Sequence, residues 1–322
     1  MKYTVSKNEV KNFLDKLSAS GNLIAPVREN SLVKFKKIAN PDEIEFDYIN
    51  SKYSIKKYFL LDKEVLFEYD KDSIKENIEE KQRIFFGIRP CDVHSLLVMD
   101  KLLLEEGMED IYYKNKRKNS LIFALKCSKS GENCFCRSLG TDDLKEGYDL
   151  LFYDEGNYYI VKTGSEKGDN FISKLEEKQE TEDEPSDPLE NQKKLSQDQI
   201  EKLRESFNSD IWKKESAICF SCAGCTTTCP TCGCFDVKDD PDLDFESGKR
   251  IRLDASCQLK NYTGVAGGHV FRDERSKRFK HRIYHKFKYF VDQYGSEMCI
   301  GCGRCITNCP ANIDMVKILN KL

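Results

Sequence analysis

The sequence has little net charge, little histidine and no long apolar run. The 322 residues carry a formal net charge of −3 and four histidines. A charge so close to zero disfavours nucleic acid or a membrane surface as a partner, and no apolar run is long enough to cross a bilayer. Residues 1–9 carry charges every few positions, where a secretion signal needs an apolar stretch. We therefore expect a cytoplasmic protein.

The sequence also lacks the common motifs of catalytic and nucleotide-binding sites. No Gly-x-Gly-x-x-Gly follows a strand-like run and no phosphate-binding Gly-x-x-x-x-Gly-Lys-Ser/Thr occurs. The few histidines form no recognisable set with a serine or cysteine nucleophile. A basic stretch, residues 272–288, has apolar residues at helical spacing. It predicts an amphipathic helix near anionic groups or facing an acidic partner, rather than a nucleic-acid helix. We expect no catalytic site of the chain's own, and electrons must then come from another polypeptide.

Cysteine is abundant. The chain contains fifteen cysteines, an odd number, and eleven of them fall in the last hundred or so residues. Reductants in the cytoplasm keep thiols reduced, so a disulfide scaffold is disfavoured. Metal ligation is the interpretation that remains.

Eight of the cysteines form two Cys-x-x-Cys-x-x-Cys-x-x-x-Cys-Pro runs. The first run is Cys219, Cys222, Cys225 and Cys229, and the second is Cys299, Cys302, Cys305 and Cys309. This is the run of bacterial two-cluster ferredoxins, in which the fourth cysteine binds the cluster of the other run. The sequence therefore predicts two [4Fe-4S] clusters, with Cys309 joining the first run and Cys229 joining the second. Zinc is the alternative, but zinc sites have no trailing Cys-Pro. About seventy residues separate Cys229 from Cys299, which predicts a long insert.

A second set of four cysteines lies in the first half of the chain. Cys91 follows the apolar run 83–88, Cys127 follows the apolar run 120–125, and Cys134 and Cys136 come from the next loop. The two apolar runs are separated by a helix-like stretch, a pattern that indicates parallel strands. Parallel strands place their carboxyl ends at one edge of a sheet. We expect a third [4Fe-4S] cluster here; a zinc ion, or cysteines that are merely buried, are the alternatives.

Three further cysteines occur in the long insert. Cys232, Cys234 and Cys257 are one ligand short of a complete set, and His269 could supply it. They predict a fourth metal site, against the alternative that they only line the other clusters.

The pattern of apolar and charged residues predicts an α+β protein. We expect an N-terminal α/β domain with a partly parallel sheet (1–174), an acidic exposed linker followed by a charged helix (175–210), and a ferredoxin-like dicluster domain with a long insert (211–322). Within the first domain, a helix around residues 12–17, strands at 57–61 and 65–69, and a hairpin turning at 154–157 are predicted.

Several motifs resemble the beta subunit of cytoplasmic [NiFe] sulfhydrogenases and, less closely, the corresponding iron–sulfur subunit of anaerobic sulfite reductase. They include Phe-Gly-Ile-Arg-Pro-Cys-Asp at 86–92, Asn-Cys-Phe-Cys at 133–136, Cys-Pro-Thr-Cys-Gly-Cys at 229–234, Ser-Cys-Gln at 256–258 and Val-Ala-Gly-Gly-His-Val-Phe-Arg at 265–272. The resemblance covers nearly the whole chain. It implies a relay with a flavin- and NAD(P)H-binding subunit on one side and a catalytic redox subunit on the other. A catalyst in its own right at Cys232, Cys234 and Cys257, and a cluster-bearing nucleic-acid binder, are the competing classes.

Overall fold

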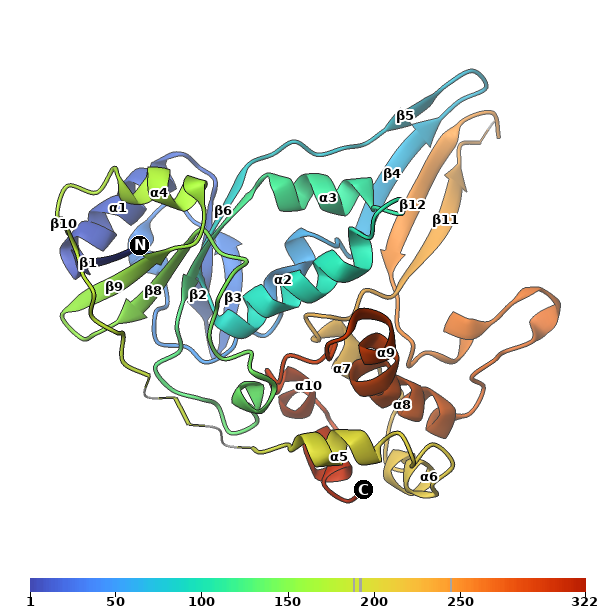
Figure 1. Cartoon of the computed structure of the whole chain (residues 1–322). Helices are drawn as coiled ribbons and strands as arrows, with labels where there is room; N and C mark the ends of the chain where they lie inside the picture. Colours follow the sequence, from blue (N-terminus) through green and yellow to red (C-terminus); the bar gives the residue numbers. More distant parts are fainter. Residues whose placement is uncertain (188, 191–192, 244) are drawn as a thin grey trace.

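A mixed eight-stranded sheet forms the N-terminal half of the protein (Figure 1). The computed structural model describes residues 1–187, 189–190, 193–243 and 245–322. From edge to edge the strands are β10 (Lys178–Glu180), β1 (Lys2–Ser6), β9 (Tyr158–Thr163), β8 (Leu150–Asp154), β7 (Ser120–Leu125), β6 (Arg83–Ile88), β2 (Leu23–Glu29) and β3 (Leu32–Lys37). The four central strands β2, β6, β7 and β8 run parallel. The predicted partly parallel sheet is confirmed.

Helices cover both faces of the sheet, and this is why its central strands are apolar throughout. On one face lie α1 (Lys7–Ala19) and α4 (Glu166–Ile172), and on the other lie α2 (Pro90–Leu103) and α3 (Ile111–Lys118). Neighbouring residues of β6 point to opposite faces, so Phe86 packs in the first core and Phe85 in the second. The predicted hairpin at 154–157 joins β8 to β9.

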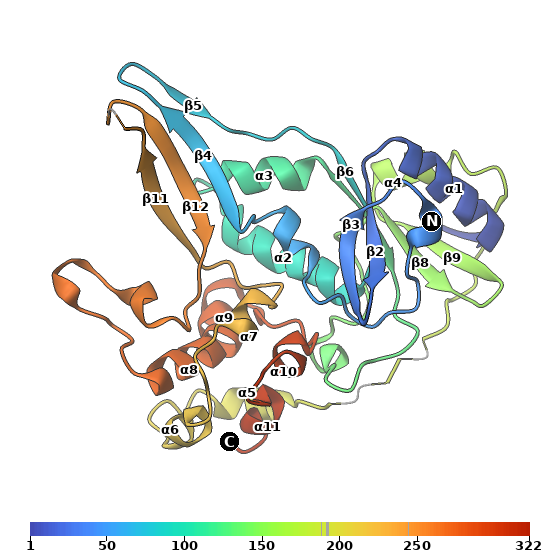
Figure 2. The same ribbon diagram turned by 180° about the vertical axis from the view of Figure 1, so that it is seen from behind.

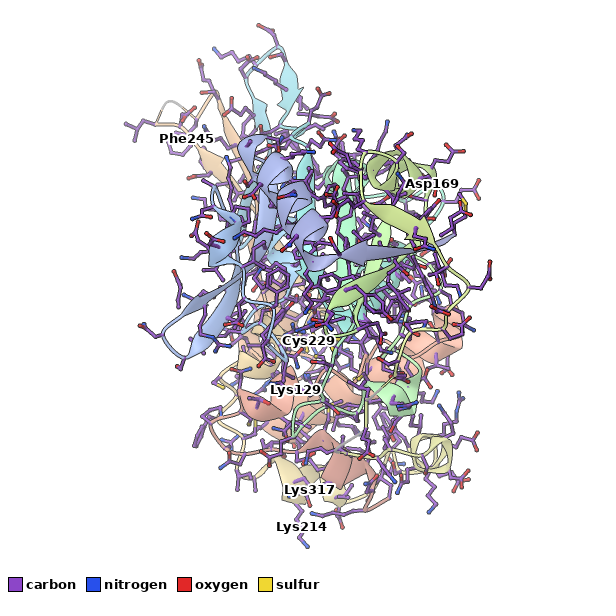
Figure 3. All side chains as sticks on the ribbon, turned by 90° about the vertical axis from the view of Figure 1, so that its left-hand side faces the viewer. Lys129, Asp169, Lys214, Cys229, Phe245 and Lys317 are labelled. Atoms are coloured by element: carbon purple, nitrogen blue, oxygen red, sulfur yellow. The ribbon has the colours of Figure 1, made fainter. Side chains whose placement is uncertain are left out.

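A second sheet contains strands from both halves of the chain. Its order is β11 (Phe235–Pro241), β12 (Gly248–Asp254), β4 (Lys63–Tyr69) and β5 (Ile74–Glu76), all antiparallel. The hairpin β11–β12 belongs to the long insert and pairs with β4 of the N-terminal half. Figures 1 and 2 show this sheet as an arm that projects from the molecule, and Figure 3 shows Phe245 at its tip. Buried Arg252 of β12 donates to Glu64 of β4 at 3.1 Å, which fixes the insert to the first half.

The acidic segment after residue 174 is not wholly an exposed linker. Its strand β10 adds to the edge of the sheet beside β1, and Leu175 and Leu189 are buried. Residues 188, 191 and 192 of this segment lie outside the described residues. The segment is anchored because Leu175 packs in one hydrophobic core and Leu189 in another. A charged helix near residues 197–207 is predicted to follow; the helix found there, α5 (Gln197–Lys202), ends earlier.

One predicted strand is wrong. Residues 57–61 contribute to the 3-10 helix η2 (Ile55–Tyr58) and the turn after it. Ser54 accepts a hydrogen bond from the Lys56 amide and thereby caps this helix. Phe59 is fully buried and its neighbours in the run are half-buried, without the alternation between two faces that a half-buried strand requires.

The C-terminal half is built from short helices around the cysteine runs. They are α6 (Ile211–Ser216), α7 (Gly224–Thr227), α8 (Arg275–Tyr284), the π-helix η6 (His285–Tyr289), α9 (Phe290–Tyr294), α10 (Arg304–Thr307) and α11 (Met315–Leu319). The insert adds the 3-10 turns η4 (Lys260–Thr263) and η5 (Ala266–Gly268), whereas η1 (Pro41–Glu43) and η3 (Cys136–Leu139) belong to the N-terminal half. The predicted amphipathic helix is confirmed, because Phe279, Ile283 and Phe287 pack in one buried cluster. In the part of the chain that the structure describes, no helix has the length and apolar character needed to span a membrane.

Candidate iron–sulfur sites

The two cysteine runs adopt the same backbone conformation. In the first run, Ser221 and Ala223 have positive φ angles of 54° and 64°. In the second, Gly301 and Gly303 stand at the equivalent positions with φ angles of 63° and 73°. Each loop turns back twice between its first three cysteines and then enters a short helix, α7 or α10. The repeated cysteine spacing is therefore a repeated structure.

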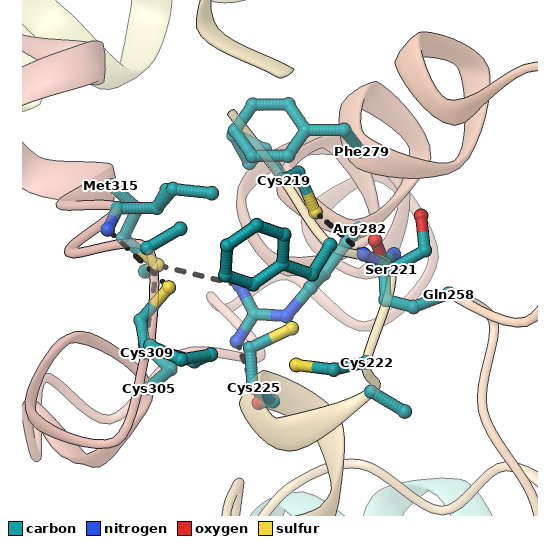
Figure 4. Close-up of a pocket in the computed structure, with 16 residues that line it drawn as sticks. Cys219, Ser221, Cys222, Cys225, Gln258, Phe279, Arg282, Cys305, Cys309 and Met315 are labelled. Atoms are coloured by element: carbon teal, nitrogen blue, oxygen red, sulfur yellow. Dashed lines mark hydrogen bonds between the residues drawn. The ribbon is translucent and has the colours of Figure 1, made fainter. Parts of the chain in front are cut away.

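The first run forms a pocket together with the last cysteine of the second run. Figure 4 shows the sulfur atoms of Cys219, Cys222 and Cys225 in this pocket, and Cys309 and Cys305 of the second run line it as well. Backbone amides donate to two of these sulfurs, from Ser221 to Cys219 and from Ile313 to Cys309, each at 3.3 Å. Amide donors of this kind stabilise thiolate charge. Cys222 is exposed, so this pocket reaches the surface.

Cys229, the last cysteine of the first run, lies among the cysteines of the second. The negative charge of its thiolate raises the pKa of Cys299, Cys302 and Cys305, which lie nearby. Burial is the largest influence on all three and raises the pKa of Cys302 to about 12. Figure 3 places Cys229 in the interior, between the large sheet and the C-terminal helices. The structure thus brings each fourth cysteine to the opposite run.

Two buried cations face these thiols. Burial lowers the pKa of the Arg282 guanidinium, but Cys225, Cys305 and other nearby thiols outweigh it, so this pKa is raised well above its usual value. Burial also lowers the pKa of Lys286, but nearby Cys229 and Cys232 outweigh it, so this pKa too is raised. The Nε atom of Arg282 is buried and has no hydrogen-bond partner among the described residues, although Arg282 lines the first pocket. An unpaired buried donor is costly, and an anionic iron–sulfur cluster ligated by thiolates would supply the missing acceptor. The residues present therefore fit such a group.

The four cysteines of the N-terminal half also converge. Cys91 lies in the first turn of α2 and Cys127 follows β7, both at the carboxyl edge of the parallel strands. Cys134 and Cys136 lie in the loop that enters η3. Burial raises the pKa of Cys136 to about 12, and its neighbours Cys134 and Cys127 add to the rise. Such thiols give up their protons only to a strong counter-charge, which bound iron or zinc supplies.

This third set lies against the second run. The amide of Phe135, between Cys134 and Cys136, donates to the carbonyl of Gly301 at 2.8 Å. Asn50 donates from Nδ2 both to the Cys302 carbonyl, at 2.7 Å, and to the Cys134 sulfur, at 3.7 Å. Sequence reasoning missed Asn50, because nothing in its neighbourhood marks a residue that joins two cysteine sets.

The three remaining cysteines line a cavity of about 150 Å³. The Cys232 amide donates to the Cys229 carbonyl at 3.4 Å, and these two cysteines affect each other's pKa, as Cys234 and Cys257 do. His269 does not line this cavity: it is exposed and its ring contacts Phe271, with the ring centres 4.8 Å apart. His285, from the basic helix, lines it instead. Sequence spacing could not identify His285, because its approach depends on how the helix packs.

The described residues contain no group of three His, Cys, Asp or Glu side chains close enough to hold a single metal ion. The zinc alternative for the N-terminal set stays a prediction to be tested.

Comparison with known proteins gives two matches and one negative result. Residues 218–313 match the model of the 4Fe-4S dicluster domain family. The sulfhydrogenase 2 subunit beta of Pyrococcus furiosus is 34% identical over 323 residues, covering 96% of this chain and 95% of the relative. The chain belongs to the sulfhydrogenase beta-subunit family. No solved structure is significantly similar to it.

Membership of the sulfhydrogenase beta-subunit family confirms the resemblance given by the motifs. The dicluster match spans both ferredoxin runs and the whole insert, and so establishes iron–sulfur clusters as the cofactors of this region. Cys91, Cys127, Cys134 and Cys136 lie outside that match, although the similarity to the relative extends over nearly the entire chain.

Proposed function

We propose that this chain is an electron-transfer subunit of a sulfhydrogenase-type complex. It relays electrons through [4Fe-4S] clusters, in the cytoplasm, with a flavin- and NAD(P)H-binding subunit on one side and a catalytic redox subunit on the other. When bound, such clusters accept and give single electrons. The name of the P. furiosus relative supports partner subunits of a sulfhydrogenase.

One observation carries this proposal: two equivalent loops each receive the fourth cysteine of the other. Cys309 lines the pocket of Cys219, Cys222 and Cys225, and Cys229 lies beside the thiols of the second run. This exchange of fourth cysteines puts the two candidate clusters next to each other, and Arg282 contacts both runs. A pair of adjacent one-electron carriers is what a relay needs.

We further propose a third cluster at Cys91, Cys127, Cys134 and Cys136. Its loop touches the second run through Phe135 and Asn50. The three sites then follow one another from the exposed Cys222 inward, through the second run, to the edge of the sheet. This order gives the relay two ends, one for each partner.

The relay is tested by mixing the anaerobically purified chain with a flavin-containing partner and NAD(P)H. We expect NAD(P)H to bleach the cluster absorbance only when the partner is present, and the chain alone to show neither hydrogenase nor sulfite reductase activity. Turnover by the isolated chain would instead favour a catalyst in its own right. Electron delivery to a sirohaem reductase, but not to a hydrogenase, would favour the alternative, the iron–sulfur subunit of an anaerobic sulfite reductase.

The third cluster is tested by counting iron in the full chain. We expect about twelve iron atoms in the wild type, and about eight in Cys127→Ser and in Cys136→Ser. Thr141→Val is the matched control, since Thr141 also joins this loop to the second run, donating to the Ile300 carbonyl at 2.8 Å, but offers no thiolate. About eight iron atoms in the wild type, or one zinc lost from the cysteine variants, would refute the third cluster.

A further inference from the structure

Cys234 and Cys257 meet at the base of the arm. Cys234 immediately precedes β11 and Cys257 follows β12 by three residues. The antiparallel ladder of the hairpin extends to this point, where the Ala255 amide donates to the Cys234 carbonyl at 3.0 Å. The hairpin therefore fixes the two thiols next to each other, independently of any bound group.

The Cys234 side chain has polar neighbours in its cavity. Cys257 and Tyr262 line the same cavity. The influence of Cys257 and Tyr262, together with nearby Lys286, outweighs burial and lowers the pKa of Cys234 to about 6, while Cys234 raises the pKa of Cys257. The pair is thus two cysteine side chains in one cavity at the base of one hairpin, a placement from which a disulfide can form.

The pair lines a cavity that Met298, the residue before Cys299 of the second run, also lines. Cys232 lines the same cavity, and its amide donates to the carbonyl of Cys229, the candidate ligand of that run, at 3.4 Å. Lys286 lines it as well and donates to the Thr231 hydroxyl at 2.7 Å. The four cysteines thus form two pairs. Cys232 and Cys229 lie at the candidate cluster site of the second run, and Cys234 and Cys257 lie apart from it.

We propose that Cys234 and Cys257 are a two-electron thiol–disulfide couple served by the neighbouring cluster. On oxidation the two thiols form one S–S bond and release two protons and two electrons. The electrons pass one at a time to the oxidised [4Fe-4S] cluster of the second run, and the reverse steps cleave the bond. The proposal rests on the proposed function, because those clusters are the electron acceptors and donors.

Such a couple suits this position in a relay. A nicotinamide or flavin partner supplies electrons in pairs, whereas a [4Fe-4S] cluster carries one. The dithiol form stores both electrons of a pair until the cluster takes them up one at a time, and the disulfide form covalently closes the base of the β11–β12 hairpin.

The test uses the full chain with its clusters, poised anaerobically at a series of potentials and quenched in acid. Free thiols are then alkylated and the peptides mapped by mass spectrometry. We expect Cys234 and Cys257 to be linked to each other in the oxidised samples and both alkylated in the reduced ones. Absence of the linked peptide at every potential, in a chain whose clusters oxidise and reduce normally, would overturn the proposal and leave the relay intact.

Two variants complete the test. Cys234→Ser should keep the wild-type iron content and take up two electrons fewer per chain in a reductive titration. Tyr262→Phe should take up as many electrons as the wild type, but at a lower midpoint for the pair, because a donor to the thiolate of the reduced form is lost. Loss of iron or zinc in Cys234→Ser would overturn the couple in favour of the fourth metal site that the sequence predicted. A wild type without iron would refute the relay itself.

Discussion

Arg304 and Asp92 form a bidentate ion pair in the interior, with Nη1 and Nη2 of Arg304 each 2.7 Å from a carboxylate oxygen of Asp92. Both side chains are almost fully buried, 2% and 0% exposed. Arg304 stands between Gly303 and Cys305 in the second run, and Asp92 follows Cys91 directly. The pair therefore joins two candidate cluster sites that are more than two hundred residues apart in sequence.

Breaking this pair should destabilise the protein. Removing one partner of a buried pair costs about 3–5 kcal/mol, because the other charge remains unpaired. We expect Arg304→Met and Asp92→Leu each to lower the thermal stability of the cluster-loaded chain and its iron content. The double variant should be more stable than either single variant, since no charge is then left buried alone. Equal or additive losses in the double variant would contradict this account.

Two glycines of the second run allow the close approach of the N-terminal loop. A Cβ atom on Gly301 would lie 2.5 Å from the Cys136 amide nitrogen, and one on Gly303 would lie 2.4 Å from the Asn133 carbonyl oxygen. Both glycines also have positive φ.

Alanine at these glycines should separate the loop from the second run. We expect Gly301→Ala and Gly303→Ala to lower iron content, chiefly at the N-terminal site, and to reduce stability. Gly295→Ala is the control, because Gly295 also has a positive φ, of 72°, but nothing lies within 4 Å of its Cβ position. An effect of Gly295→Ala equal to the other two would show that backbone strain, rather than loop contact, is responsible.

The sequence predicted the parts of this protein that depend on local spacing. The buried strands β6 and β7, the helix between them and the fold class follow from runs of apolar residues, whose periods are local properties. The sequence did not show why the second run has Gly301 and Gly303 where the first run has Ser221 and Ala223. The reason is tertiary packing, because Cys136 and Asn133 lie against the two glycines.

Contacts between residues far apart in the sequence could not be predicted from the sequence. The pairing of β12 with β4, the separation of His269 from the thiols of the insert, and the approach of His285 depend on tertiary packing. The strand predicted at 57–61 failed because Ser54 caps a 3-10 helix there, and a cap outweighed the apolar composition.

The crossed ligation makes a prediction about pairs of variants. If Cys309 completes the first site, Cys309→Ser should give the same electron paramagnetic resonance spectrum in the reduced state as Cys222→Ser. Cys229→Ser should in turn match Cys302→Ser. Ligands of one cluster act as a unit, so combining Cys222→Ser with Cys309→Ser should add little further loss. Agreement of Cys229→Ser with Cys222→Ser would show that each run holds its own fourth ligand.

Arg282 should set the reduction potential of the sites it touches. Its Nη2 donates to the Cys225 carbonyl at 3.1 Å, and its charge also acts on Cys305 of the second run. Reduction adds negative charge to a cluster, which a buried cation stabilises. At an effective dielectric constant of about 20 and a distance of about 8 Å, one unit charge is worth about 2 kcal/mol, or roughly 90 mV for a one-electron step.

We therefore expect Arg282→Met to lower the midpoint potentials of both ferredoxin-type sites by on the order of 50–100 mV. Arg275→Met is the control: Arg275 belongs to the same helix but is exposed, and it donates to the Ala217 carbonyl at 2.9 Å. Its removal should shift the potentials little, because water screens an exposed charge. Midpoints in Arg282→Met equal to those of the control, at full iron content, would mean that this buried cation does not act on the clusters.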